Sequence, residues 1–541
     1  MWTATLELDP LRAIATQLLG RFWREAYFSS FAPFQMRNLP RPALPAADWV
    51  RVRNRLAGVC GSDLHMIYLD GDPRIAPAAL PGIDRTYPGH EVVGEVIEVG
   101  DEAQTLRVGD NVVLQHRPNC LSAGIQPLCR SCAAGNYNLC ERGVLPGPAS
   151  IGGGWSEEML LHEQQLFRIP NAINQPDTPQ LSDEQAALLE PSAVATHAVL
   201  RCVPQAGNRV LIIGAGTIGL LTLQAVRALA PQAEVSVMAR HAFQVEQATR
   251  MGATHIIYPQ DSYKTIQQAT GAQLYQGLLG NKLLLGGYDV IFDTVGSKST
   301  IHNSLRWARA RGSVVLVGVS LHLMSLDLTP VWYQEVNLIG TMAHGAEEWP
   351  IGSQTYRSTF EVTADLIEQG LLYPEQLITH RFALNDYRHA LLTAMDKGKS
   401  RAIKVVFDYA LQPPSVVPNV RAAARQRRPH STTSRRLPDP APIEFSTFPT
   451  TSISPADPQR APSVPLTPTC IEEDSLTGEP GEPGQEEMSL SSTRTKFAQT
   501  PRSHPGVTND TPDALQSVEE ETDGVQEPEL RAMEPENKSG I

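Results

Sequence analysis

Short apolar runs alternate with helix-like segments in the middle of the chain, and this pattern predicts parallel βαβ units. Strands that alternate with helices build a parallel sheet covered by helices on both faces. We therefore expect a doubly wound α/β domain over residues 204–345, with strands at 209–213, 234–238, 288–292, 313–317 and 336–339.

The flanking regions have a different pattern. Residues 39–162 are rich in Gly, Pro and Val, and 91–100 and 109–115 resemble short strands between turns. We expect a β-rich domain there, extending to about residue 203. Residues 346–410 contain a helix-like stretch at 360–369 and a last strand-like run at 402–407.

Near the start of the chain, within the extension 1–38, apolar residues recur at helical spacing with arginines between them: Leu11, Ile14, Leu18, Leu19, Phe22 and Trp23, with Arg12, Arg21 and Arg24. A basic amphipathic helix can lie on a membrane. The more ordinary expectation, which we adopt, is a helix that packs on its own domain.

After Tyr409 the composition changes to Pro, Ser, Thr and Glu, and aromatic residues almost vanish. Such a segment cannot bury enough apolar area to offset its ordering entropy, so we expect 411–541 to be disordered. Its basic first part and acidic end could bind a partner, although a solvated linker is the simpler interpretation.

Composition and charge narrow the function. The formal net charge of the 541 residues is -13, which disfavours nucleic acid as a partner. We find no secretory signal and no transmembrane segment, and we expect no membrane partner. Four of the seven cysteines fall within 120–140, which in a chain of this kind indicates metal binding in a reducing cytoplasm.

The sequence GAGTIG directly follows the strand predicted at 209–213 and opens an apolar helix. In this context it predicts a dinucleotide site, because glycines allow a tight turn and a close approach of backbone to the pyrophosphate. The helix N-terminus adds unpaired N–H groups. The alternative is a glycine-rich turn without a ligand. The candidate cofactor residues are Gly214, Gly216, Thr217, Ile218 and Gly219.

The strand predicted at 234–238 is followed by Arg240, not by the carboxylate that binds the ribose 2′-OH of NAD. A guanidinium at this place could bind a 2′-phosphate. We therefore favour NADP over NAD, and the alternative is that Arg240 is a solvated surface residue.

Two sets of residues have metal-ligating chemistry. Cys120, Cys129, Cys132 and Cys140 suit a closed tetrahedral zinc site that stabilises the fold. The second set would leave one position open for water or substrate, as catalytic zinc requires. It contains Cys60, His90 and one or both of Glu91 and Glu190.

Seven segments, in this order, resemble the medium-chain zinc-dependent dehydrogenases, which include alcohol, sorbitol, threonine and glucose dehydrogenases. They are GVCGSDLH, PGHEVVGEV, CAAGNYNLC, EPSAVATHAV, VLIIGAGTIGLL, VIFDTVG and AIKVVF. The resemblance covers about residues 40–408. It implies a chaperonin-10-like catalytic domain, formed by 39–203 and 346–410, with the Rossmann domain inserted between the two parts and the active site in the cleft.

The resemblance also implies an activity: hydride transfer between an alcohol, polyol or sugar hydroxyl and NAD(P), with one catalytic and one structural zinc. Cys60 and His90 would bind the catalytic ion, and Glu91 or Glu190 would complete the set. Ser62 would relay the substrate proton and His65 would pass it towards solvent. A turn hydroxyl for Ser62 and a packed histidine for His65 are the alternatives.

The chain departs from the family in several places. The usual first cysteine of the lobe would be Gln126 here, so Cys120 must reach around a longer loop, and its ligation stays open. Residues 272–286 are longer than a simple Rossmann unit needs, and the first 35 or so residues lack the family's opening strand. Family members are commonly dimers or tetramers, so we expect a homo-oligomer. The substrate itself is not predicted.

Two other functions are compatible with this fold. One is a non-catalytic nucleotide-binding or interaction protein, and the other is a zinc-free reductase. Neither has a need for Cys60, His90 and Glu190 together.

Overall fold

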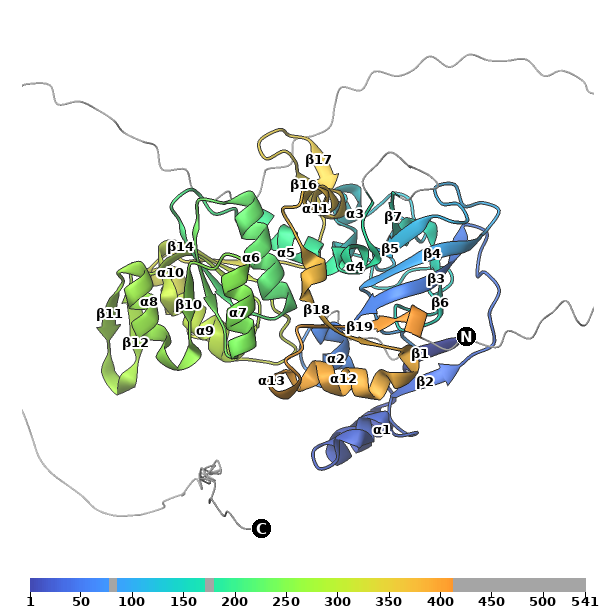
Figure 1. Ribbon diagram of the computed structural model, residues 1–541, viewed down its shortest axis with the longest axis horizontal. Helices are drawn as coiled ribbons and strands as arrows, with labels where there is room; N and C mark the ends of the chain where they lie inside the picture. Colours follow the sequence, from blue (N-terminus) through green and yellow to red (C-terminus); the bar gives the residue numbers. More distant parts are fainter. Residues whose placement is uncertain (77–84, 171–179, 412–541) are drawn as a thin grey trace, which may run out of the picture. The chain divides into compact units, whose positions relative to one another are not determined.

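The computed structural model describes residues 1–76, 85–170 and 180–411. The tail that we predict to be disordered lies outside these residues. The described chain contains two large sheets, one parallel and one mainly antiparallel (Figure 1).

The parallel sheet has six strands in the order β10-β9-β8-β13-β14-β15. This is the Rossmann order, with the first strand, β8, in the middle. Its strands are apolar on both faces because helices cover both sides. The strands are β8 (Arg209–Ile213), β9 (Glu234–Met238), β10 (His255–Ile257), β13 (Tyr288–Asp293), β14 (Ala308–Leu316) and β15 (Asn337–Gly340). The helices between them are α6 (Thr217–Leu229), α7 (Ala242–Arg250), α8 (Ser262–Thr270), α9 (Lys298–Trp307) and α10 (Thr329–Tyr333).

The second sheet joins the two ends of the described chain. Strand β19, from the last part of the chain, pairs with β3, so that Val406 lies opposite Gly58. The Rossmann region is therefore inserted within one β-rich domain, as the resemblance implies. The strands are β3 (Trp49–Gly58), β4 (Val92–Val99), β5 (Asn111–Leu114), β6 (Glu158–His162), β7 (Leu166–Ile169), β18 (Ile378–Phe382) and β19 (Lys404–Asp408).

One continuous apolar core connects the two sheets. It includes Val93 and Val113 of the antiparallel sheet and Val210 and Ile212 of the parallel sheet. Helix α5 (Leu189–Leu200) packs against α6 and contributes small buried side chains to this core. Further helices of this region are α2 (Gly61–Ile67), α3 (Arg130–Ala133), α4 (Asp183–Ala187), α11 (Thr359–Glu368), α12 (Tyr387–Met395) and α13 (Lys397–Ser400). Strand β16 (Ala346–Glu348) pairs with β17 (Tyr356–Ser358).

The expectation that the first 35 or so residues lack a strand is wrong. Strand β1 (Trp2–Leu6) pairs in antiparallel register with β2 (Phe34–Asn38), almost thirty residues later. The two strands enclose helix α1 (Pro10–Gly20) and the 3-10 turn η1 (Arg24–Phe28). The partner of β1 is distant in the sequence, and two buried positions of β1 are polar, Thr3 and Thr5. The apolar pattern alone therefore did not indicate a strand.

The predicted N-terminal helix is confirmed as α1, and it packs on its own domain as expected, but through Arg12, Gln17 and Gly20 and not through its apolar side chains. Its large apolar side chains are exposed, and Thr16 and Gly20 are its buried residues. The extra length at 272–286 has a simple explanation: the residues form a two-stranded hairpin, β11 (Gln273–Gln276) and β12 (Lys282–Leu285). Among the described residues, no helix has the length and apolar character that crossing a bilayer requires.

Candidate functional site

A cavity of about 1120 Å³ lies between the antiparallel sheet and the ends of the parallel strands. Cys60, His90 and Glu190 line it from the β-rich side, whereas Thr294 and Gly318 line it from loops that follow β13 and β14. Ligands of open α/β sheets bind at the carboxyl ends of the strands. The cavity therefore brings the predicted metal ligands and the predicted cofactor edge into one space.

The structure brings three of the predicted catalytic ligands together. Cys60 is the N-cap of α2 (Gly61–Ile67), and His90 and Glu91 directly precede β4. One ligand atom from each lies within 4.8 Å of the others. A thiolate, an imidazole and a carboxylate at this spacing form a donor set that suits zinc.

Glu91 has a buried partner that the sequence analysis did not foresee. The Lys404 ammonium, on β19, donates to both carboxylate oxygens, at 2.8 and 2.5 Å, and to the carbonyl oxygen of Val59 at 3.3 Å. Burial alone would lower the pKa of Lys404, but Glu91 and Cys60 raise it, and the net shift is upward. Lys404 therefore stays charged and neutralises Glu91.

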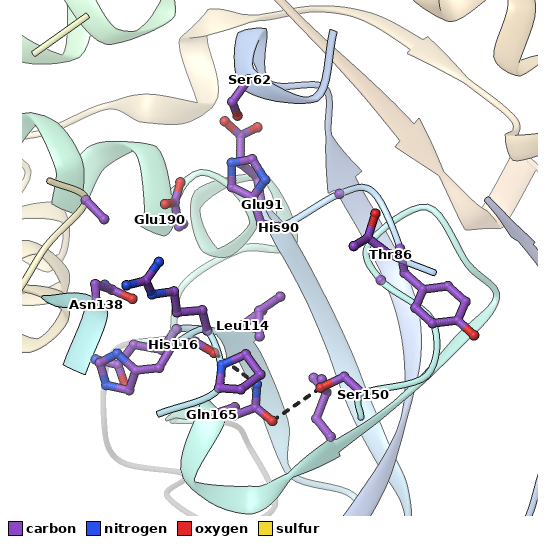
Figure 2. Close-up of a pocket in the computed structure, with 18 of the residues that line it drawn as sticks. Ser62, Thr86, His90, Glu91, Leu114, His116, Asn138, Ser150, Gln165 and Glu190 are labelled. Atoms are coloured by element: carbon purple, nitrogen blue, oxygen red, sulfur yellow. Dashed lines mark hydrogen bonds between the residues drawn. The ribbon is translucent and has the colours of Figure 1, made fainter. Parts of the chain in front are cut away.

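Glu190 is the second residue of α5 and faces the cavity beside His90 and Glu91 (Figure 2). It is not within the 4.8 Å group. Burial raises its pKa to about 7; His90 lowers this pKa and Glu91 raises it. A nearby positive charge would lower this pKa and keep Glu190 ionised, so its position suits a cation in the cavity.

Asp63 holds the metal-ligand loops in place, and the sequence analysis gave it no role. Its buried carboxylate accepts hydrogen bonds from the backbone N–H groups of Gly89, at 3.1 Å, and Cys60, at 3.4 Å. It also lies 3.5 Å from His90 Nδ1. A carboxylate on the free nitrogen of a ligating histidine fixes the ring orientation.

Ser62 and His65 both line the cavity from α2. His65 Nδ1 is hydrogen-bonded to Asp70 at 2.8 Å, and Asp70 is hydrogen-bonded in turn to His322 at 2.9 Å. His65 and His322 are partly exposed. The sequence analysis named Ser62 and His65, but not Asp70 and His322, which extend this chain of hydrogen bonds.

Of the glycines predicted to bind the cofactor, Gly214 and Gly216 lie between β8 and α6, and Gly219 lies in the first turn of α6. Gly214 has a φ of 100°, and a Cβ at Gly219 would lie 1.9 Å from the carbonyl oxygen of Gly214. The turn therefore needs glycine at both positions. The Thr217 hydroxyl donates to the carbonyl oxygen of Ile403, so it faces the β-rich domain.

Two cations lie near the same edge. Arg240 is exposed and follows β9, which neighbours β8 in the sheet. The Lys397 ammonium would lie 3.9 Å from a Cβ placed at Gly216, beside the helix N-terminus where a phosphate binds. Lys397 is far away in sequence, and no motif pointed to it.

The four cysteines of the predicted structural site lie together, and Cys120 is one of them. One sulfur atom from each lies within 4.8 Å of the others. Cys129 caps α3 (Arg130–Ala133), where the backbone N–H groups of Glu141 and Cys132 lower its pKa to about 6. Cys120 and Cys132 are fully buried. The longer loop therefore allows Cys120 to reach the cluster, and this closed set fits zinc.

The lower wall of the cavity is polar, and the sequence gave no signal of it. Figure 2 shows His116, Asn138, Ser150 and Gln165 around this wall, below His90 and Glu190. The Nδ1 atom of His116 is buried without a hydrogen-bond partner among the described residues. Burial lowers the pKa of His116 to about 4, so the ring is neutral and can donate or accept one hydrogen bond.

Comparisons with known proteins agree with this geometry. Residues 46–171 match the family model described as alcohol dehydrogenase GroES-like domain, and residues 217–357 match zinc-binding dehydrogenase. Sorbitol dehydrogenase of Arabidopsis thaliana is 28% identical, over 66% of this chain and 88% of its own length. L-idonate 5-dehydrogenase of Vitis vinifera is 29% identical, over 68% of this chain and 89% of its own length.

Solved structures are similar as well. The crystal structure of 2R,3R-butanediol dehydrogenase from Bacillus subtilis superimposes with a TM-score of 0.53 at 27% sequence identity. The match covers 69% of this chain and 96% of that protein. The match thus spans almost the whole of the other protein and stops short of the full length of this one.

We expect Cys132→Ser to remove one zinc ion per chain and to lower the thermal midpoint of unfolding by roughly ten degrees or more, because a structural zinc contributes directly to folding. Metal analysis and calorimetry of the purified protein measure both effects. The matched control is Cys202→Ser, a buried cysteine outside the cluster, which should keep its zinc. Equal zinc content in the two variants would contradict the assignment.

Proposed function

We propose that this chain, which belongs to the medium-chain zinc-dependent alcohol and polyol dehydrogenase family, oxidises a hydroxyl group of a polyol or sugar and transfers the hydride to a nicotinamide dinucleotide. One observation carries the proposal. A single cavity is lined by the Cys60, His90 and Glu190 side chains and by the loops at the carboxyl edge of the Rossmann sheet.

We propose Cys60, His90 and Glu190 as the three ligands of the catalytic zinc. Glu91 lies closer to the first two, but its charge and both of its oxygens are already engaged by Lys404. Glu190 forms no ion pair among the described residues and has a carboxylate that a cation would stabilise. When bound, zinc acts as a Lewis acid that makes the substrate hydroxyl easier to deprotonate.

The chain's own groups would remove the proton. Ser62 lines the cavity one turn before His65 on α2. His65 can pass a proton on through its hydrogen bond to Asp70, which contacts His322 near the surface. A proton that leaves the cavity along this path does not have to cross the apolar core.

The polar cavity wall supports a substrate with several hydroxyl groups. The buried His116 Nδ1 has no partner among the described residues and could meet a substrate hydroxyl. Ser150, Gln165 and Asn138 line the same wall and already form hydrogen bonds within the protein. A site built from such groups discriminates against analogues that leave them unpaired. The relatives named after sorbitol and idonate agree with a polyhydroxylated substrate.

We propose that the cofactor pyrophosphate binds at the turn Gly214–Gly219 near Lys397, and that Arg240 binds a 2′-phosphate. The exposed guanidinium after the end of β9 supports NADP.

The domain boundaries predicted at about 204, 346 and 411 remain part of this proposal.

The direct test follows nicotinamide absorbance with purified protein, NADP⁺ or NAD⁺, and a panel of polyols, sugars, simple alcohols and L-threonine. We expect turnover with at least one polyol or sugar, and we expect a zinc chelator to abolish it. A folded, zinc-loaded protein that shows no turnover with any combination of cofactor and substrate would refute the proposed substrate range and favour a nucleotide-binding role.

We expect Arg240→Ala to raise the KM for NADP⁺ by roughly ten- to a hundred-fold, because a charge-assisted hydrogen bond contributes about 1.5–3 kcal/mol. The KM for NAD⁺ should stay within about twofold of the wild-type value, since NAD⁺ has no 2′-phosphate. Arg250→Ala, at the exposed end of α7, serves as the control. An equal effect of Arg240→Ala on the two cofactors would rule out the phosphate contact.

A further inference from the structure

Helix α1 turns its apolar side chains away from the protein. Phe22, in the turn after the helix, is 93% exposed and Leu11 is 79% exposed. The exposed apolar residues, here called the α1 face, are Leu11, Ile14, Leu18, Leu19, Phe22 and Trp23. At 100° per residue, Leu11, Ile14, Leu18 and Phe22 fall within one narrow stripe. This stripe lies opposite the buried Thr16 and Gly20.

The polar side of α1 is held against the protein by specific contacts. Arg12 donates to the carbonyl oxygens of Phe31, at 2.7 Å, and Ala32, at 2.9 Å. Gln17 donates to the carbonyl oxygen of Leu69 at 3.3 Å, and Gly20 lies directly against the Tyr27 ring. Figure 1 shows α1 at the edge of the β-rich domain, near β2. The helix is thus fixed in this orientation, with the α1 face outward.

Such a face needs a partner. A globular protein normally turns the apolar stripe of a surface helix to its core. A contiguous exposed apolar patch marks a protein or membrane contact. In the described part of the chain, no element covers the α1 face.

The charges around the α1 face identify the partner. From Pro10 to Arg24 the chain contains three arginines and no acidic residue, and the exposed Glu25 follows directly. The neighbouring carboxylate of Asp9 is engaged as the helix N-cap, where it accepts from the backbone N–H of Arg12. Arg21 and Arg24 are exposed and form no salt bridge among the described residues. Cations next to Leu, Phe and Trp side chains are typical of helices that lie in the headgroup region of anionic bilayers.

We propose that the α1 face binds the surface of an anionic membrane, and so attaches this dehydrogenase to the bilayer as a peripheral protein. The eleven residues of α1 are about 16 Å long, far shorter than the roughly 30 Å of a bilayer core. The helix therefore lies in the plane of the surface, with Leu18 and Phe22 inserted and Arg21 and Arg24 at the lipid phosphates. This proposal replaces the sequence-based expectation of no membrane partner.

The test is co-sedimentation of the full chain with two kinds of vesicle, pure phosphatidylcholine and phosphatidylcholine mixed with phosphatidylserine. We expect binding to the mixed vesicles to be roughly tenfold stronger or more and to weaken as salt is added. Leu18→Gln with Phe22→Gln should reduce this binding by roughly tenfold or more, since it removes the two side chains that would insert.

A matched control removes equivalent apolar side chains elsewhere. Leu278→Gln with Leu279→Gln changes two exposed leucines at the tip of the β11–β12 hairpin, and it should bind vesicles as the unchanged protein does. Because all four residues are exposed, both variants should keep the circular dichroism spectrum and thermal midpoint of the parent.

Three results would overturn the proposal: equal binding to both kinds of vesicle, equal loss in the two variants, or no binding at all. The protein could instead bind no vesicle and self-associate, as measured by light scattering. If the Leu18 and Phe22 substitutions then abolished this self-association, a second copy of the chain would be what covers the α1 face.

Discussion

The buried ion pair between Lys404 and Glu91 is the interaction that decides which carboxylate of the site is free to bind a cation. Lys404 is on the last strand of the antiparallel sheet, and Glu91 precedes β4. Both side chains are almost completely buried. Removing one partner of such a pair leaves an uncompensated charge and costs about 3–5 kcal/mol. Lys404 also donates to the carbonyl oxygen of Val59, directly after β3 and next to Cys60. It therefore ties the last strand of the described chain to the loops that carry Cys60 and His90.

This pair divides the roles of the two glutamates. Glu91 is neutralised by a resident cation of the chain, whereas Glu190 has no such partner and has its pKa raised to about 7. The two groups of potential metal ligands also differ from each other. The four cysteines at 120–140 leave no position for substrate, whereas the set around Cys60 faces a large cavity. One metal would then stabilise the fold, and the other would take part in chemistry.

Most of the fold could be predicted because its information is local. The strands at 209–213 and 234–238 were predicted with their observed bounds, since each is a short apolar run next to a helix. Cys60, His90, Glu91 and Glu190 could be proposed because each belongs to a short motif. The structure then placed one ligand atom from each of the first three within 4.8 Å of the others, and the fourth on the same side of the cavity.

The missed features depend on contacts between distant residues. Lys404 is 313 residues from Glu91, and the polar wall around His116 comes from several loops. Strand β1 finds its partner almost thirty residues away. For α1, the helical spacing of apolar residues predicted the helix. It did not predict whether the apolar side is buried or exposed, because the same spacing fits a face that packs on the core and a face that binds a membrane.

The most direct test of this account is to count zinc and measure turnover in two variants. Glu190→Gln should lose one of two zinc ions per chain together with its turnover, and should keep its fold. Glu91→Gln combined with Lys404→Met removes both charges of the buried pair, so no unpaired charge is left, and it should keep both zinc ions. A double variant with one zinc ion, beside a Glu190→Gln protein that keeps two, would show that Glu91 is the ligand and contradict the central claim.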